Sequence, residues 1–257
     1  MQTEEKVTDE ILDLRVGQRV EVRRPEEILA TLDERGELDS LPFMPEMLQY
    51  CGRQFTIYKV AHKLCDTLTL TGMRRMENAV HLAGVRCDGG GHDGCQAACL
   101  IYWKTAWLKP VEAPAEAAVP DGSRLLPLLV SASRKPPGAD GSPRYSCQAT
   151  EILRAAPETV PVRELRQYVR DVRSGNANLW WTLRAFGVGI FNQVQNRSRA
   201  WPRWLRFRGG LRWGFLKGTA ERTPTAEIGL QPGELVRVRS REEIMKTLDQ
   251  SLKNRGM

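Results

Sequence analysis

The stretch that decides the fold is Gly17-Gln-Arg-Val-Glu-Val-Arg-Arg-Pro-Glu-Glu-Ile-Leu-Ala-Thr-Leu-Asp33. It returns as Gly233-Glu-Leu-Val-Arg-Val-Arg-Ser-Arg-Glu-Glu-Ile-Met-Lys-Thr-Leu-Asp249, with ten of the 17 positions identical at a constant offset of 216. Chance does not produce this density of identity at one fixed offset. The stretch therefore indicates a duplicated structural unit.

Within this unit the pattern predicts a strand followed by a short helix. Val20 and Val22 alternate with charged neighbours, which is typical of a half-buried strand. Residues 26–32 then begin with two acids, which suit the positive end of a helix, and continue with apolar residues that share one face. Pro25 fits the first helical position, and Gly36 fits a helix stop.

Further strands are predicted at 55–60, 68–70 and 80–85, and residues 102–108 close the unit. Short strands at such close spacing are typical of a small closed barrel. The sequence therefore predicts a mainly β fold with some α structure (α+β), in which residues 14–111 form a small Src-homology-like β-barrel.

The rest of the chain divides into three predicted segments. Residues 112–144 are rich in Pro, Gly and Ala, which indicates a linker. Residues 145–229 form a basic, aromatic and partly helical segment, with helices expected over 163–173 and 179–194. Residues 230–257 begin the second repeat and stop before a second barrel is complete. Because one strand and one helix bury too little apolar surface to offset their ordering entropy, we expect a fragment of a longer two-barrel protein.

Composition favours an intracellular globular protein. Of the 257 residues, 41% are hydrophobic and 27% are charged, which is ordinary for a globular chain. No apolar run reaches the roughly 20 residues that a bilayer crossing requires. Residues 1–13 are acidic and lack the apolar core of a secretion signal, so we predict a cytoplasmic protein. Thiols stay reduced there, and six cysteines then indicate metal ligands or redox groups rather than disulfides.

The strongest chemical signal comes from four cysteines, Cys65, Cys87, Cys95 and Cys99, which we predict to be metal ligands. The last three lie in a glycine-rich stretch, 86–99, whose backbone can fold tightly and turn its amides toward thiolate sulfur. Four converging thiolates would hold zinc or an iron–sulfur cluster. The irregular spacing of these cysteines differs from the paired CxxC motifs of zinc knuckles and favours an iron–sulfur cluster. Alternatively, the cysteines are small buried core residues.

Three further side chains are candidates for additional ligands. His62 precedes Cys65 by three positions, and Cys147 follows the predicted linker. His92 lies inside the glycine-rich stretch, where it would ligate metal, shuttle a proton or be a solvated loop histidine. His81, in a strand pattern, is expected to be structural.

A basic aromatic segment provides the second signal. Between residues 163 and 217 there are 12 basic residues against two acids, so this segment carries +10 and the rest of the chain −3 of the net +7. Arginine neutralises phosphate and aromatic rings stack on unpaired bases, which makes Arg203, Arg206, Arg208 and Trp204 candidates for nucleic-acid contact. Three alternatives remain: an anionic membrane surface, a protein partner, or aromatic residues packed in a core with arginines at its rim.

Motifs of common enzyme classes are absent from the sequence. It contains no GxxxxGK[ST] phosphate loop, no GxSxG elbow and no HExxH. The sequence therefore predicts no particular reaction and leaves open whether the protein is an enzyme.

Four motifs resemble an uncharacterised bacterial family: Glu26-Glu-Ile-Leu-Ala-Thr-Leu-Asp33, Met47-Leu-Gln-Tyr-Cys-Gly52, Leu82-Ala-Gly-Val-Arg-Cys87 and Trp103-Lys-Thr-Ala-Trp-Leu108. Its members carry two such units and are often encoded near genes for secondary-metabolite or polysaccharide biosynthesis. The resemblance implies a context and no established activity. The leading hypothesis is a metal-binding accessory or scaffold protein of a biosynthetic pathway. The alternatives are a nucleic-acid-binding protein and an iron–sulfur redox enzyme.

Overall fold

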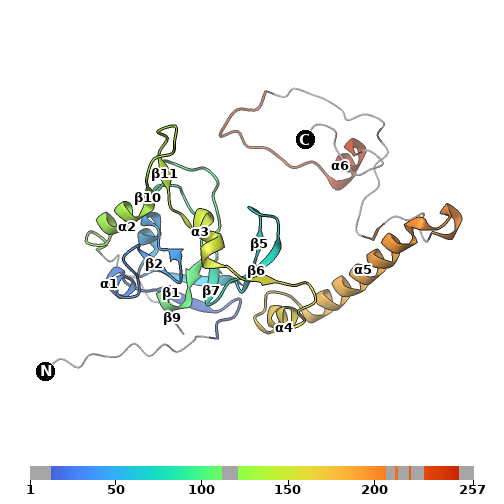
Figure 1. Ribbon diagram of the computed structural model, residues 1–257, viewed down its shortest axis with the longest axis horizontal. Helices are drawn as coiled ribbons and strands as arrows, with labels where there is room; N and C mark the ends of the chain where they lie inside the picture. The colour runs from blue at the N-terminus through green and yellow to red at the C-terminus, as the bar shows by residue number, and fades with distance from the viewer. Residues whose placement is uncertain (1–12, 112–120, 207–211, 214–219, 221–228, 249–257) are drawn as a thin grey trace. The chain divides into compact units, whose positions relative to one another are not determined.

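The computed structural model describes residues 13–111, 121–206, 212–213, 220 and 229–248 (Figure 1). The chain divides into two compact units, Met1–Leu179 and Trp180–Met257. Within the described ranges, no helix combines the length and the apolar character that a membrane crossing requires.

A five-stranded antiparallel sheet forms the centre of the first unit. The strand order is β8-β7-β4-β1-β9. In this order the strands are β8 (Trp103–Lys104), β7 (Ala79–Leu82), β4 (Gln54–Val60), β1 (Arg19–Val22) and β9 (Leu108–Pro110). Every neighbouring pair is antiparallel. The predicted α+β class is confirmed, but the expected predominance of β structure is wrong, because helices cover more of the described residues than strands do.

The predicted closed barrel is wrong. Among the described residues β8 and β9 are the two free edges of the five-stranded sheet, and no pairing joins them. β5 (Lys63–Asp66) and β6 (Gly72–Arg75), which were not predicted, form a second, three-stranded sheet with β12 (Thr159–Val160) in the order β12-β6-β5. β12 comes from a distant part of the chain, so its pairing with β6 was not visible in local strand spacing.

The turn between β5 and β6 occupies a position where a strand was predicted. Leu68 and Leu70 are 57% and 83% exposed, and Leu70 has a positive φ of 56°. The Asp66 carboxylate explains this turn, because it accepts hydrogen bonds from the backbone N–H groups of Leu68 (3.0 Å) and Thr69 (2.7 Å). A side chain that binds the backbone two and three residues ahead favours a turn over a strand.

The repeated motif builds the core of the first unit as expected. Val20 and Val22 of β1 are fully buried. Helix α1 (Pro25–Leu29) has its proline at the first position, and the Glu27 side chain accepts a hydrogen bond from the Arg24 N–H (2.9 Å). This contact satisfies one of the backbone donors at the helix start.

Shorter elements complete the first unit. Near the repeat lie β2 (Glu37–Leu38), β3 (Leu41–Pro42), the 3-10 helix η1 (Pro45–Tyr50) and the 3-10 helix η2 (Thr105–Trp107). Later in the chain come α2 (Leu126–Ser133), β10 (Arg134–Lys135), β11 (Arg144–Tyr145), α3 (Gln148–Ala155) and α4 (Arg166–Arg173).

Part of the predicted linker packs into the first unit. Leu125 and Leu129 are each 2% exposed and belong to the main hydrophobic core. Gln148 of α3 is buried, and its amide donates hydrogen bonds to the backbone oxygens of Pro42 (3.1 Å) and Tyr102 (2.9 Å). The boundary between the two units along the chain therefore falls after residue 179 and not within 112–144. Residues 112–120 lie outside the described residues.

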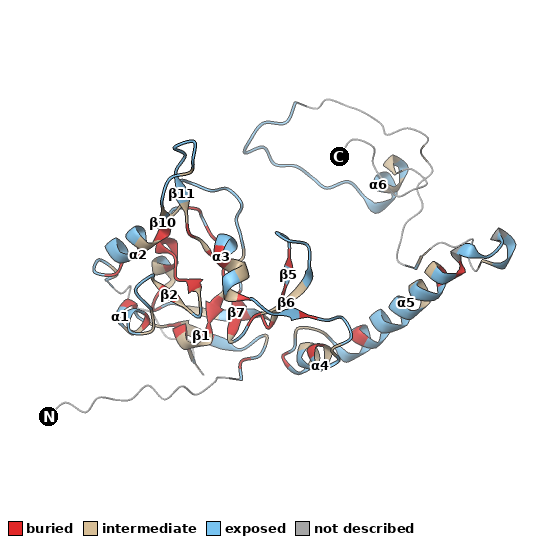
Figure 2. Ribbon diagram, in the orientation of Figure 1, coloured by how far each residue is buried: buried red, intermediate tan, exposed pale blue. Residues whose placement is uncertain are grey.

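The second unit contains α5 (Leu179–Arg197, of which Leu179 belongs to the first unit), the 3-10 helices η3 (Ser198–Ala200) and η4 (Arg203–Leu205), and α6 (Arg241–Thr247). The helix of the repeat recurs here, because α6 starts at an offset of 216 from α1. Ser240 and Glu243 cap it through reciprocal hydrogen bonds. Residues 235–238, the counterpart of β1, form no strand and are largely exposed (Figure 2). The described part of this unit offers no equivalent of β4 and β9 to pair with them.

Candidate metal site

A glycine-rich loop holds Cys87 and His92 on the first unit. The Cys87 N–H donates to the Cys99 carbonyl (2.9 Å), which joins the two ends of the loop. The His92 N–H donates to the Gly89 carbonyl (3.0 Å), which turns the chain back on itself. Gly89 has a positive φ of 77°, and a Cβ there would lie 2.2 Å from the Cys95 backbone oxygen. Only glycine fits this turn.

A buried carboxylate, Glu46, faces this loop from η1. Pro45 starts the 3-10 helix, and Glu46 lies in its first turn with its side chain 2% exposed. The loop backbone approaches it closely at Gly91, where an added Cβ would lie 2.3 Å from Glu46 Oε2. Gln49 of the same helix donates to the Asp88 carboxylate (2.9 Å) and fastens the loop to η1.

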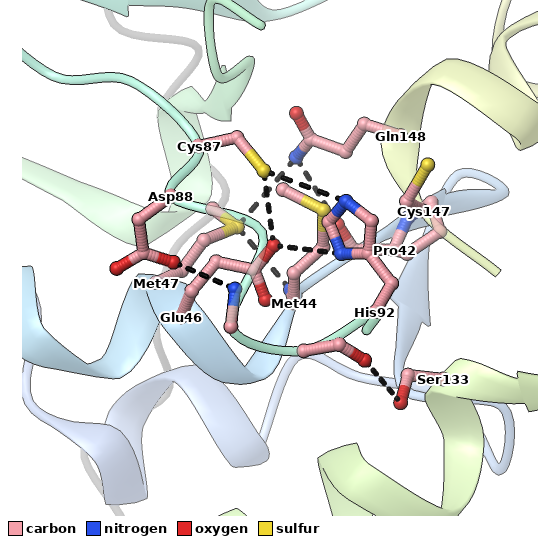
Figure 3. Close-up of polar contacts among 12 residues, drawn as sticks. Pro42, Met44, Glu46, Met47, Cys87, Asp88, His92, Ser133, Cys147 and Gln148 are labelled. Carbon is pink, nitrogen blue, oxygen red and sulfur yellow. Dashed lines mark hydrogen bonds and ion pairs between the residues drawn. The ribbon is translucent and has the colours of Figure 1, made fainter. Parts of the chain in front are cut away.

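Glu46, Cys87 and His92 converge on one point (Figure 3). Glu46 Oε1 lies 3.2 Å from Cys87 Sγ and 3.3 Å from His92 Nδ1. His92 Nε2 lies 3.7 Å from Cys87 Sγ. One ligand atom from each residue lies within 4.8 Å of the other two. The three side chains thus offer sulfur, nitrogen and oxygen donors around a single position.

Electrostatics at this position favour a cation. Burial raises the pKa of the Cys87 thiol to about 12, and its hydrogen bond to Glu46 acts in the same direction. The thiol is therefore protonated at neutral pH in the metal-free protein. Glu46 Oε2 is buried without a hydrogen-bond partner. An unpartnered buried carboxylate oxygen is costly, and a metal ion that replaced the thiol proton would supply the missing positive charge.

The structure brings together two of the side chains named from the sequence, Cys87 and His92. Cys65, Cys95 and Cys99 are exposed and do not belong to the cluster. In the described ranges, no other group of three or more His, Cys, Asp or Glu residues converges in this way. The four-cysteine centre therefore stays a prediction.

Glu46 was not predicted as a ligand from the sequence, because it lies 41 positions before Cys87 and reaches it only through the tertiary fold. A signal for it was present. It is the single charged residue in the mainly apolar stretch 41–50. An acid in such a stretch is a candidate for burial beside a partner.

The two other histidines have structural contacts. His62 Nε2 lies 3.2 Å from Asp171 Oδ1, and its Nδ1 lies 3.4 Å from the Asn176 amide. Burial lowers the pKa of His62, and the neighbouring Asp171 opposes that shift. His62 thus links β5 to α4 and the turn that follows it. His81 Nδ1 lies 2.9 Å from the Ile101 carbonyl oxygen, in agreement with its predicted structural role.

A pocket of about 420 Å³ lies beside the cluster. Two of the cluster residues, Cys87 and His92, form part of its wall. Cys65, Cys99 and Cys147 also line it, whereas Cys95 does not. Four of the five cysteines proposed as ligands therefore face one cavity, although their sulfur atoms do not form a compact ligand set.

The basic aromatic segment exposes several tryptophans. Trp180, Trp181 and Trp204 are 78%, 66% and 82% exposed, so these three rings are not core residues of the described chain. Arg206 Nε donates to the Trp201 carbonyl oxygen (2.8 Å). Arg208 and the side chain of Arg203 lie outside the described residues.

The fold and the cluster define an α+β protein with a candidate site for a single metal ion. No protein-family model, curated protein or solved structure matches the chain.

Proposed function

We propose that the chain is a metal-binding protein that holds one zinc ion through Glu46, Cys87 and His92. One observation carries the proposal: a buried carboxylate, a buried thiol and a largely buried imidazole place their donor atoms within 4.8 Å of one another. Such groups are the usual protein ligands of zinc, and three of them leave a fourth coordination position open.

The donor set favours a single ion over a cluster at this position. Iron–sulfur clusters are held mainly by thiolates, and only one of the three donors here is sulfur. Among divalent ions, a mixture of thiolate, imidazole and carboxylate suits zinc and its spectroscopic substitute cobalt. Hard ions such as magnesium prefer oxygen alone.

The ion would connect two separate parts of the first unit. Glu46 belongs to η1, whereas Cys87 and His92 belong to the glycine-rich loop. Metal binding to ligands that only the folded chain assembles contributes directly to folding free energy. This supports a role as a metal-stabilised accessory or scaffold module, with an open position at which an exchangeable ligand can bind.

Titration with Zn²⁺ and Co²⁺ tests the proposal. We expect one ion per chain, a cobalt spectrum with a thiolate-to-metal band, and at least a tenfold loss of affinity in each of Glu46→Gln, Cys87→Ser and His92→Gln. The matched control is Cys95→Ser, an exposed cysteine outside the cluster. Binding that survives the Glu46 and His92 changes but is lost with Cys95→Ser would reject this site in favour of the four-cysteine centre.

A second candidate function, that of an iron–sulfur protein, is favoured by a different observation. Cys65, Cys87, Cys99 and Cys147 line the same pocket. The ligands of a cluster lie farther apart than those of a single ion because the iron and sulfide atoms intervene. A cluster therefore does not require these four sulfur atoms to touch.

Anaerobic reconstitution with Fe²⁺ and sulfide separates the two candidates. A cluster would give a brown protein absorbing near 400 nm, lost in Cys65→Ala, Cys99→Ala and Cys147→Ala and kept in Cys95→Ala and Glu46→Gln. A colourless product that still binds one zinc ion would reject the cluster.

A further inference from the structure

We propose that the pocket beside the metal site binds a small apolar thiol, whose sulfur takes the open coordination position of the ion. The inference rests on the proposed single-metal site and names the class of molecule that this site recognises. It follows from the position of the pocket, from its wall and from its few polar groups.

The position of the pocket links it to the metal. Cys87 and His92 form part of its wall, and Glu46 does not. An ion held by these three residues would therefore have Glu46 behind it and the pocket in front. Figure 3 shows Cys147 and Gln148, which also line the pocket, close to Cys87 and His92. The open coordination position would face this space.

The wall of the pocket is mainly apolar. Its volume, about 420 Å³, lies within the usual range for small-molecule sites. Apolar and sulfur-containing side chains form most of the lining, among them Met44, Leu64, Leu68, Leu100, Ile101 and Ile152. Such a wall stabilises a hydrocarbon tail by removing it from water.

The polar groups of the wall differ in what they offer to a bound carboxylate. Gln148 uses its amide N–H groups on the Pro42 and Tyr102 carbonyls, and its oxygen accepts from the Tyr102 N–H (2.7 Å). Arg86 is exposed and uses Nη1 on the Ala98 carbonyl (2.8 Å), and its other N–H groups can donate to a carboxylate.

His81 supplies no hydrogen-bond donor to the pocket. Its Nδ1 must carry the proton, since the Ile101 carbonyl at 2.9 Å only accepts. Burial lowers the pKa of this imidazole, so it stays neutral and its Nε2 is an acceptor. Thiolate sulfur is a preferred zinc ligand and needs few hydrogen bonds, so a thiol takes the open coordination position. The comparison with hexanoate tests this choice against a carboxylate held by Arg86.

Binding of alkane thiols to the cobalt-loaded full chain tests the inference. The probes are ethanethiol, butanethiol and hexanethiol. The readout is the thiolate-to-cobalt absorption that the bound thiol adds to that of Cys87. We expect the Kd to tighten about fourfold for each added methylene that enters the apolar pocket. Hexanoate, which matches hexanethiol in chain length, should bind more weakly.

Two tryptophan variants localise the effect. Ala149 is an exposed residue of α3 that lines the pocket, so Ala149→Trp should fill the cavity and abolish the dependence on chain length. Ala30 is an exposed alanine outside the pocket, and Ala30→Trp should behave as wild type. Both variants should bind one Co²⁺ with unchanged affinity, which shows that they fold.

The outcomes separate this inference from the metal site itself. Normal Co²⁺ binding with equal affinity for all three thiols would overturn the inference and leave the proposed function intact. Tighter binding of hexanoate than of hexanethiol would overturn the choice of a thiol. Failure of the chain to bind Co²⁺ through Glu46 would overturn the proposed function, and this inference with it.

Discussion

At the scale of single residues, the site depends on how closely a loop backbone can approach a carboxylate. Gly91 packs against Glu46 and Pro45 with no room for a side chain. The neighbouring Gly90 differs, since its nearest atom would be the flexible Asp88 carboxylate at 3.2 Å. Two adjacent glycines of one loop thus face different steric limits, and the pair provides a matched test of the site.

Gly91→Ala should weaken metal binding. The new Cβ would lie 2.3 Å from Glu46 Oε2 and 2.9 Å from Pro45 Cδ, so the carboxylate or the loop must move. Changes that disturb the positioning of metal ligands typically reduce affinity about 10–100-fold. Isothermal titration with Zn²⁺ measures the effect, with Gly90→Ala as the control. Equal affinities in the two variants would contradict the proposed role of Gly91.

At the scale of elements, the β5–β6 hairpin depends on one buried acid. The Asp66 carboxylate accepts hydrogen bonds from the hydroxyl groups of Thr69 and Thr71 and from Arg74 Nε (2.7 Å). The Thr69 hydroxyl, followed by Thr71 and Arg74, holds the pKa of Asp66 well below its usual range. The charged carboxylate is thus the form on which the folded hairpin depends.

Asp66→Asn should lower stability in a pH-dependent way. A depressed pKa contributes stability above the usual carboxyl pKa of about 4, and this contribution is lost as the pH falls below that value. The urea midpoint of the variant should therefore fall below that of wild type at pH 7, and the gap should narrow at pH 3. A gap of the same size at both pH values would show that the charge of Asp66 is not responsible.

The same scale shows what local sequence can and cannot determine. β1 and α1 were predictable because alternation, a proline at the helix start and acids in the first turn are local signals. The 68–70 segment was mispredicted because its leucines resembled a strand, while Asp66 specified a turn. Helices expected over 163–173 and 179–194 appear as α4 and α5 with shifted ends.

At the scale of the whole molecule, prediction was limited by contacts between distant segments. An open sheet and a closed barrel can share the same strands and differ only in which edges pair, and strand spacing does not report that choice. The site shows the same limit: the glycine-rich loop was recognisable, but its carboxylate partner, Glu46, comes from another element. Leu125 and Leu129, which were predicted to lie in a linker, likewise belong to the hydrophobic core through contacts with distant segments.

The hypothesis of nucleic-acid binding belongs to the second unit and stays a prediction. If it holds, single-stranded oligonucleotides should bind at low salt, with log K falling by about 0.7 per log unit of salt for each neutralised phosphate. Trp204→Ala should weaken binding by about 5–150-fold if a base stacks on this exposed ring, and Trp204→Phe should largely restore it. Fluorescence anisotropy across a salt series measures both effects, and no affinity at low salt would reject the hypothesis.

Metal binding should stabilise the two units unequally, because all three proposed ligands belong to the first unit. Zinc at a hundred times its Kd should contribute about 2.7 kcal/mol to the stability of that unit. For a folding unit of this size, that corresponds to a rise of about 5–10 °C in its Tm. Calorimetry with and without zinc should therefore show one transition that shifts and, where the second unit gives its own transition, one that does not. Glu46→Gln should remove the shift while Cys95→Ser keeps it. Stoichiometric zinc binding without any shift would mean that the ion does not connect η1 to the loop.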